Sequence, residues 1–360
     1  KNAGVVNLVG NKLAELPPAI GTLLKVTELN VSENRLTALP PEVSQLVTLR
    51  VLDVNDNKIA SIDDFIGSLV NLERLDAYKN AIVALSPQVA LLTNLKELNL
   101  FNNQLADIPA EVSKLEGLEL LNVASNKLSG VPELKGLKGL KRLALFWNKL
   151  TALPSLETME ELEDLQLSKN QLEALPDMST LTALKSLSIS NNKLSALPGV
   201  HKCVSLNEIT AGSNQFTALP ENLSLLPELS KVVMAQNQIT QLPPDVFNIP
   251  ELQTLDVAEN KITELSADVG KLKNLTNLFV QGNKIGALPA TLKDLPDIKR
   301  ITLTGNPIVT TDADTAKLLG ELKAMCEKNG GKMLGPEKEV AAGGGKAKFS
   351  LGKFKAAGGS

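Results

Sequence analysis

One repeated frame constrains the fold of this 360-residue chain more than any other feature of its sequence. Asparagine recurs fourteen times at intervals of 22 or 23 residues, each time in a frame of the type L-x-x-L-x-L-x-x-N-x-L, as over residues 95–105. A period of this length is typical of a solenoid, in which each repeat forms one coil and the coils stack. The repeated asparagines are Asn11, Asn34, Asn57, Asn80, Asn103, Asn126, Asn148, Asn170, Asn192, Asn214, Asn237, Asn260, Asn283 and Asn306.

The frame predicts one short strand in each coil. Side chains alternate along a strand, so the leucines of the L-x-L core point inward and the x residues point outward. One coil cannot bury its leucines alone, and stacked coils therefore align their strands in a parallel sheet on the concave face. The asparagine amide both donates and accepts hydrogen bonds, and we expect it to satisfy backbone groups where the strand ends. The fold class predicted is an α/β solenoid with a horseshoe shape.

A proline follows most of the repeated asparagines after a short interval, as at Leu39-Pro40 and Leu197-Pro198. Proline fixes φ and removes a hydrogen-bond donor, so the return segment of each coil is expected to be a turn and not a long helix. The four 22-residue intervals, between Asn126 and Asn214, lack one residue after the proline. The convex side of the solenoid is therefore predicted to be thin.

These motifs resemble the 22–23-residue L-P type of leucine-rich repeat found in cytosolic Ras-pathway scaffolds and in plant intracellular Ras-group proteins. The run that carries the resemblance is L-P-x-x-(I/V)-x-x-L-x-x-L-x-x-L-x-L-x-x-N, and it covers residues 1–309. The stretch from Asn126 to Asn214 is closer to the shorter repeats of a phosphatase-regulatory type. The resemblance implies a repeat scaffold whose members share the fold and differ in their partners.

Residues 310–334 are expected to close the last coil. Thr311 and Asp314 have the spacing of a capping box, and Asn329-Gly330 is a helix stop signal. We therefore expect an amphipathic helix over residues 312–329 that covers the leucines of the last coil. Its apolar face is expected to contain Ala316, Leu319, Leu322, Met325 and Cys326.

Residues 335–360 differ from the repeats in composition, with three consecutive glycines and a basic end that cannot form a core. Two interpretations of this tail are open. It is either a solvated segment or a docking segment whose lysines meet an acidic surface while its phenylalanines act as anchors. The docking candidates are Lys346, Lys348, Phe349, Lys353, Phe354 and Lys355.

Composition argues against several functional classes. The chain has 37 basic and 40 acidic residues, so it lacks the basic excess of a dedicated nucleic-acid binder. One histidine, His201, and two cysteines, Cys203 and Cys326, indicate neither a His-rich metal site nor a disulfide framework. No apolar run is long enough for a membrane span, and no phosphate-binding glycine motif precedes a helix. We expect a cytoplasmic, non-enzymatic protein without cofactor or metal, with His201 at the outer surface and Cys203 in the core.

The outward strand positions form the candidate binding surface. Five of the ten aromatic residues fall on this face, four of them within four consecutive coils. Tyr78, Phe101, Ala124 and Phe146 share one column and would form a stripe about 15 Å long, since strands lie about 4.8 Å apart. Exposed aromatic residues of this kind match interface hot spots, and the alternative is that the rings pack on one another as a hydrophobic ladder. The predicted partner-binding residues are Tyr78, Phe101, Phe146, Trp147, Arg74, Arg142, Asn99 and Asn122.

The concave side of the first five coils is acidic, with residues such as Asp53, Asp56 and Asp76. These side chains either make local hydrogen bonds or form a landing surface for a basic peptide. Two hypotheses for the whole protein follow. The first is a protein-interaction scaffold that binds a protein partner on its concave face. The alternative is a structural subunit of a large cytoskeletal or ciliary assembly, docked through the solenoid and the basic tail.

Overall fold

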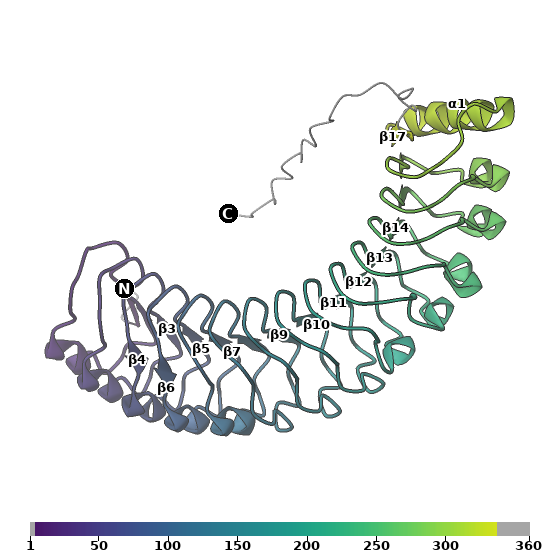
Figure 1. Ribbon diagram of the computed structural model, residues 1–360. Helices are drawn as coiled ribbons and strands as arrows, with labels where there is room; N and C mark the ends of the chain where they lie inside the picture. The colour runs from purple at the N-terminus through teal and green to yellow at the C-terminus, as the bar shows by residue number, and fades with distance from the viewer. Residues whose placement is uncertain (1–3, 337–360) are drawn as a thin grey trace.

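The computed structural model describes residues 4–336, which form a horseshoe of stacked coils (Figure 1). Each of fifteen strands pairs in parallel with the next one in the sheet, so the predicted fold class is confirmed. The register aligns the repeats: Leu75 lies opposite Leu98, which occupies the same position in the next coil. The sheet contains, in order, β1 (Val5–Asn7), β2 (Glu28–Asn30), β3 (Val51–Asp53), β5 (Arg74–Asp76), β7 (Glu97–Asn99), β8 (Leu120–Asn122), β9 (Arg142–Ala144), β10 (Asp164–Gln166), β11 (Ser186–Ser188), β12 (Glu208–Thr210), β13 (Lys231–Val233), β14 (Thr254–Asp256), β15 (Asn277–Phe279), β16 (Arg300–Thr302) and β17 (Lys332–Leu334).

The repeated asparagine joins each coil to the one before it. The Nδ2 atom of Asn103 donates to the carbonyl oxygen of Leu100 in its own coil and to that of Ala77 in the preceding coil, both at 3.0 Å. Its Oδ1 atom accepts from the backbone nitrogen of Ile82, also at 3.0 Å. Equivalent contacts occur at the repeated asparagines on either side. The structural role predicted for this amide is therefore confirmed.

The convex side is thin, as expected from the short period. Most 23-residue coils return through a short 3-10 helix, whereas the fully described stretch from residue 115 to residue 199 returns through turns alone. This stretch includes most of the 22-residue coils, in which the missing residue leaves less chain for a helical turn. The 3-10 helices are η1 (Pro18–Thr22), η2 (Pro41–Gln45), η3 (Asp64–Ser68), η4 (Pro87–Leu91), η5 (Ala110–Lys114), η6 (Val200–Lys202), η7 (Leu223–Leu225), η8 (Pro244–Asn248), η9 (Ala267–Lys271) and η10 (Ala290–Asp294). Two further short strands, β4 (Ser61–Ile62) and β6 (Ala84–Leu85), pair with each other.

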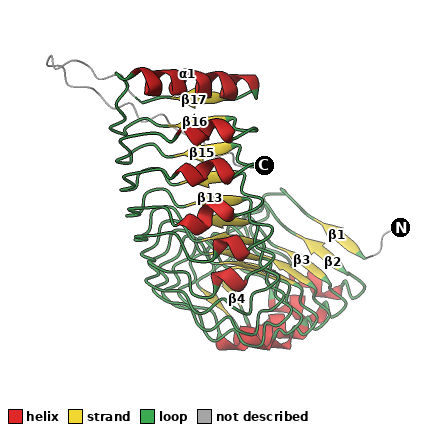
Figure 2. Cartoon of the chain, turned by 90° about the vertical axis from the view of Figure 1, so that its right-hand side faces the viewer, coloured by secondary structure: helices red, strands yellow, loops and turns green. Residues whose placement is uncertain are grey.

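Helix α1 (Ala313–Lys328) covers the end of the array (Figure 2). Leu318, Leu322 and Cys326 are buried along one line of the helix, because residues four apart lie on the same face. The expectation for Ala316 is wrong: it is exposed, since it lies two residues away from this line. The expected capping box is also wrong, because the helix starts one residue later and Asp312 is its N-cap. The Asp312 Oδ1 atom accepts from the backbone nitrogen of Thr315 at 2.8 Å.

Strand β17 follows the helix and was not predicted from the sequence. The Asn329 Nδ2 atom donates to the carbonyl oxygens of Pro296 and Ile298, both at 2.9 Å, and thereby holds the chain on the last coil. At Gly331 a Cβ atom would lie 1.9 Å from the carbonyl oxygen of Lys299, so only glycine fits this approach. The expected tail continues beyond Pro336, where residues 337–360 and all six docking candidates lie outside the described residues. Within residues 4–336, no helix has the length and apolarity that a bilayer crossing requires.

Candidate functional site

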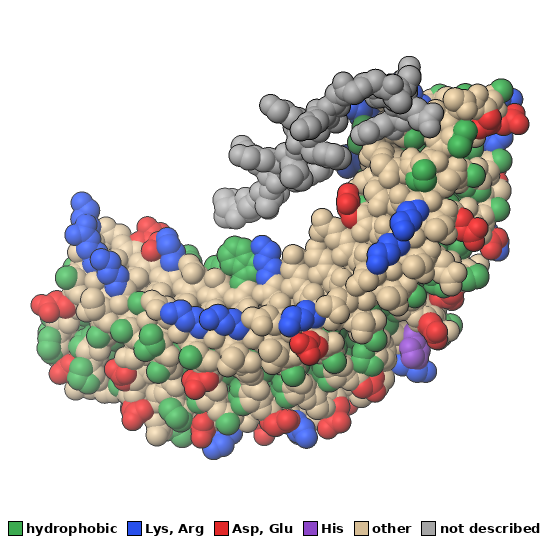
Figure 3. Space-filling view, in the orientation of Figure 1, with side chains coloured by type: hydrophobic (Ala, Val, Ile, Leu, Met, Phe, Trp, Pro, Cys, Tyr) green, Lys and Arg blue, Asp and Glu red, His purple; other side chains and the backbone are tan. Residues whose placement is uncertain are grey.

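The candidate site lies on the concave face, in the coils of strands β5 to β10. Figure 3 shows a hydrophobic patch on this side of the horseshoe with a basic side chain beside it, and a row of Lys and Arg side chains along the near rim. The strands present their outer residues here because the central leucine of each strand is buried in the core. The predicted partner-binding residues therefore share one surface, but they differ in exposure and in their contacts.

Phe101 and Phe146 form the apolar floor of this site. Their ring centroids lie 5.9 Å apart, although β8 separates their strands in the sheet. Ala124, between them in the same column, is 0% exposed. The expectation of a solvent-exposed stripe is wrong for these three residues, because the two half-buried rings lean together over a small side chain. The alternative of a packed hydrophobic ladder describes this part of the column.

Trp147 is the exposed aromatic residue of the site, with 52% of its surface accessible. Its φ is 55°, since the residue before a repeated asparagine adopts the left-handed conformation throughout the array. The other coils place polar residues or glycine at this position, and these tolerate the conformation better than a bulky ring does. Neither the backbone nor the core therefore accounts for the presence of a tryptophan here.

Three lysines flank Trp147: one in its own coil, one in the preceding coil and one in the following coil. The Nζ atom of Lys169, one coil further on, lies 4.4 Å from the centroid of the indole ring, in cation–π geometry. Lys127 and Lys149 follow the repeated asparagines of their coils, and the Lys127 Nζ atom donates to Gln104 Oε1 at 3.1 Å. Among the described residues, no carboxylate lies within 4.0 Å of these three ammonium groups. The site therefore carries unneutralised positive charge.

These lysines were not among the predicted residues, because the prediction rests on the strand positions and not on the loop positions that flank each asparagine. The signal is present in the sequence. The residue directly after the repeated asparagine is basic in eight of the fourteen coils and acidic in none. The basic residues are Lys12, Arg35, Lys58, Lys127, Lys149, Lys193, Lys261 and Lys284.

Tyr78 lies at the acidic end of the site. Burial raises the pKa of Asp76 above its ordinary value, and the neighbouring Asp53 carboxylate raises it further. Burial and the nearby Asp76 carboxylate likewise raise the pKa of Tyr78. Arg74 is exposed and approaches Asp76 at 3.9 Å, too far for a strong pair. This end of the site is therefore negatively charged, in contrast to the surroundings of Trp147.

The two predicted asparagines are held by their own coils. The Asn99 Oδ1 atom accepts from the backbone nitrogen of Phe101 at 3.2 Å, and its Nδ2 atom donates to Asp76 at 3.1 Å. The Asn122 Oδ1 atom accepts from the backbone nitrogen of Ala124 at 3.1 Å. These contacts support the local hydrogen-bonding role that was one of the two interpretations of this column.

Arg142 stands beside a ladder of alternating charge at the other end of the strands. The residue seven positions before the repeated asparagine alternates in sign over seven coils. Lys141 pairs with Glu119 at 3.0 Å, and Lys185 pairs with Glu163 at 2.9 Å. These exposed charges neutralise one another. This edge of the sheet therefore carries less net charge than the surroundings of Trp147 with their three lysines. The ladder is formed by Arg50, Glu73, Lys96, Glu119, Lys141, Glu163 and Lys185.

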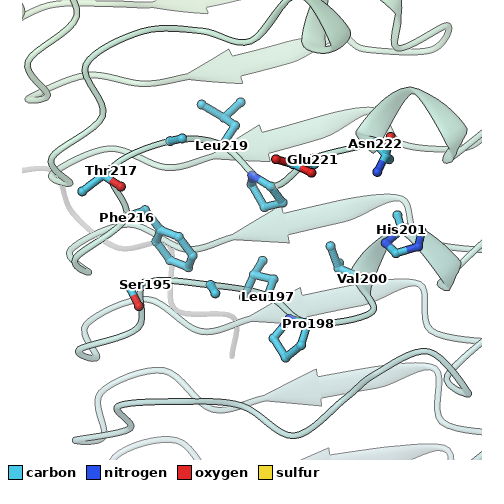
Figure 4. Close-up of a pocket in the computed structure, with 13 residues that line it drawn as sticks. Ser195, Leu197, Pro198, Val200, His201, Phe216, Thr217, Leu219, Glu221 and Asn222 are labelled. Carbon is cyan, nitrogen blue, oxygen red and sulfur yellow. The ribbon is translucent and has the colours of Figure 1, made fainter.

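A crevice of 370 Å³ lies away from this site, where the 22-residue coils give way to 23-residue coils (Figure 4). Phe216 lies at one end and His201 at the other, the latter in η6 on the outer side of its coil as expected. Cys203 is buried nearby, as predicted, and its thiol donates to the carbonyl oxygen of Met178 at 3.4 Å. Burial raises the pKa of this thiol to about 12, so it is a poor nucleophile. Across residues 4–336, no cluster of three or more His, Cys, Asp or Glu side chains is placed to hold a metal ion.

Comparison with known proteins identifies the repeat. A family model described as "Leucine-rich repeat region" matches residues 42–238, and one described as "Leucine rich repeat" matches residues 227–285 and 250–308. The chain belongs to the leucine-rich repeat family. Leucine-rich repeat proteins are typically non-enzymatic modules that bind other proteins through extended concave surfaces. No curated protein sequence matches this leucine-rich repeat chain.

Solved leucine-rich repeat structures share the architecture. A leucine-rich repeat protein of Leptospira interrogans is 28% identical, with a TM-score of 0.75, over 89% of this chain and 94% of its own. YopM of Yersinia enterocolitica is 29% identical, with a TM-score of 0.62, over 82% of this chain and 58% of its own. The ectodomain of the Arabidopsis thaliana receptor kinase GASSHO1/SCHENGEN3, solved with CASPARIAN STRIP INTEGRITY FACTOR 2, is 24% identical, with a TM-score of 0.69. It covers 92% of this chain and 44% of its own, and this last likeness shows the fold alone.

Proposed function

We propose that this protein is a non-enzymatic interaction scaffold that binds a protein partner at the aromatic site on its concave face. The observation that supports the proposal is Trp147. It is an exposed indole held in a backbone conformation that disfavours it, beside an apolar floor of Phe101 and Phe146. Exposed aromatic residues surrounded by other apolar and polar contacts are the usual energetic centres of protein interfaces. Arg74, Arg142, Asn99 and Asn122 would then form the rim of the interface.

The finer resemblance to cytosolic Ras-pathway scaffolds, and with it a cytoplasmic location, is part of this proposal. Both cysteines of the chain are free and buried, which suits a reducing compartment. The cytoskeletal or ciliary alternative depends chiefly on the tail, which lies almost entirely outside the described residues. The described part of the chain contains no observation that favours the alternative over the scaffold.

Affinity capture with matched variants tests the scaffold proposal. The full chain is immobilised, and proteins retained from a lysate are identified by mass spectrometry for the wild type, Trp147→Ala and Leu225→Ala. Leu225 is an equally exposed apolar side chain, 60% accessible, in the convex helix η7, so its variant is the control. We expect a partner whose recovery falls at least about tenfold with Trp147→Ala and is unchanged with Leu225→Ala. A partner that both variants retain equally would contradict a concave aromatic site.

A further inference from the structure

The charge distribution around Trp147 indicates which charge its partner should carry. In the four coils from β7 to β10, three columns lie next to the repeated asparagine: two residues before it, one before it and one after it. Their twelve positions contain three lysines and no acidic residue. In the other ten coils the same columns hold seven basic and three acidic residues, and some of these charges are neutralised, as where Lys79 pairs with Asp56 at 2.6 Å. In these three columns, the coils that present the aromatic rings therefore combine positive charge with the absence of any acidic residue.

We propose that this patch, defined by Phe101, Phe146, Trp147 and the three lysines, binds a short acidic segment of a protein partner. This inference rests on the proposed function and specifies the partner's chemistry. An aromatic or aliphatic anchor of the segment packs on the indole and the phenylalanine floor. Neighbouring carboxylates accept hydrogen bonds from the ammonium groups of Lys127, Lys149 and Lys169, which have no carboxylate partner among the described residues.

The length of the acidic segment follows from what surrounds the patch. Four coils span about 15 Å, which an extended peptide crosses in about four or five residues. A longer polyanion running toward the first coils would meet Asp76 and Asp53, which lie in the next two strands beyond Phe101. The same carboxylates would repel a nucleic-acid strand laid along the face. The geometry thus favours a compact acidic motif within a protein over an extended polyanion.

Peptide display on the full-length chain tests this inference. Random 12-residue peptides without tryptophan are selected on the folded protein at low salt, and the enriched peptides are synthesised. Their binding is titrated by the fluorescence of Trp147, which is the only tryptophan in the chain and therefore reports on the patch directly. We expect enriched peptides with two or more Asp or Glu residues close to a Phe, Tyr or Leu, whose affinity falls about tenfold as NaCl rises from about 50 to 500 mM.

Charge-reversal variants supply a matched control. Lys127→Glu/Lys149→Glu changes the patch, whereas Lys261→Glu/Lys284→Glu changes the same column far from it. Lys261 contacts Gln238 at 3.2 Å as Lys127 contacts Gln104 at 3.1 Å, so the two pairs share their local environment. We expect the first double variant to weaken binding of the enriched peptides about tenfold or more and the second to change it less than about twofold.

The outcomes separate this inference from the proposed function. Binding of the enriched peptides to Trp147→Ala is measured by surface plasmon resonance. Peptides that fail to bind this variant but carry no acidic cluster would overturn the inference and leave the scaffold function intact. Equal binding to the two double variants would do the same. Peptides that bind Trp147→Ala as they bind the wild type would contradict both proposals. A selection that enriches no peptide also counts against the inference, while the capture experiment still decides the function.

Discussion

The rings of Phe101 and Phe146 meet 5.9 Å apart over Ala124, although their strands are not neighbours in the sheet. Two strand spacings separate their backbones by about 9.6 Å, so the side chains lean toward each other and cover the methyl group between them. An adjacent aromatic, Trp147, is more exposed, with 52% of its surface accessible. The aromatic site therefore combines a part that stabilises the array with a part that does not.

The first prediction separates these two parts. Phe101→Ala should lower the free energy of unfolding by about 1–2 kcal/mol, because it removes half-buried apolar surface and uncovers Ala124. Trp147→Gly should not lower it, because glycine adopts the left-handed backbone conformation at no steric cost. Chemical denaturation followed by circular dichroism measures both. If Trp147→Gly destabilised the protein as much as Phe101→Ala, the indole would be a packing element and the interface would have to be sought elsewhere.

The architecture was predictable because the period constrains every coil in the same way. The asparagine contacts and the buried Cys203 follow from the frame alone, since each is a position repeated along the array. The burial of Ala124 was not predictable from its column, because it depends on the size of the side chains in the two flanking coils. The contact between Lys169 and Trp147 depends on the left-handed backbone before each asparagine, which is a geometric property that the residue types at this position do not reveal. The candidate site thus depends largely on the residues that differ between repeats.

A second prediction concerns the tight junction between coils at Gly136. A Cβ atom there would lie 1.8 Å from the carbonyl oxygen of Ser113, where the last 3-10 helix of the first half meets the shorter coils. Gly136→Ala should therefore destabilise the protein by about 1–3 kcal/mol through displacement of the backbone. Gly130→Ala is the control, because no atom lies within 4 Å of a Cβ atom at that position. Equal thermal stability of the two variants would show that the coils at Gly136 separate without strain.

The two thiols allow a third prediction about which part of the array opens first. Cys203 and Cys326 are both 0% exposed, and burial raises the pKa of each thiol above its ordinary value. Since the thiolate is the reactive species, neither should react appreciably with iodoacetamide at pH 8 while the protein is folded. Cys326 lies on the terminal helix, which packs on η10 and β17 at the end of the array, so it should be labelled at lower denaturant concentration than Cys203. Peptide mass spectrometry across a urea series measures the order, and earlier labelling of Cys203 would place the weakest point within the array.

The last prediction concerns pH and Asp256 in β14. Burial raises the pKa of this carboxyl above its ordinary value, and the only hydrogen bond opposing the shift comes from the backbone nitrogen of Ala258 at 3.1 Å. Because the pKa is higher in the folded state than in the unfolded state, the folded protein binds more protons in the interval between the two values. The contribution of Asp256 to the free energy of unfolding therefore rises as the pH falls through this interval and is lowest at neutral pH.

Asp256→Asn should accordingly stabilise the protein at pH 7, by an amount on the order of 1 kcal/mol, because the amide keeps an acceptor for Ala258 without a buried charge. The difference from the wild type should disappear below about pH 3, where the aspartate is largely protonated in both states. Thermal unfolding of both proteins at the two pH values measures the effect, and Asp107→Asn, which removes an exposed carboxylate, is the control. A loss of stability at pH 7 would mean that the charge of Asp256 is satisfied by contacts other than Ala258, and that burial is not the dominant influence on this carboxylate.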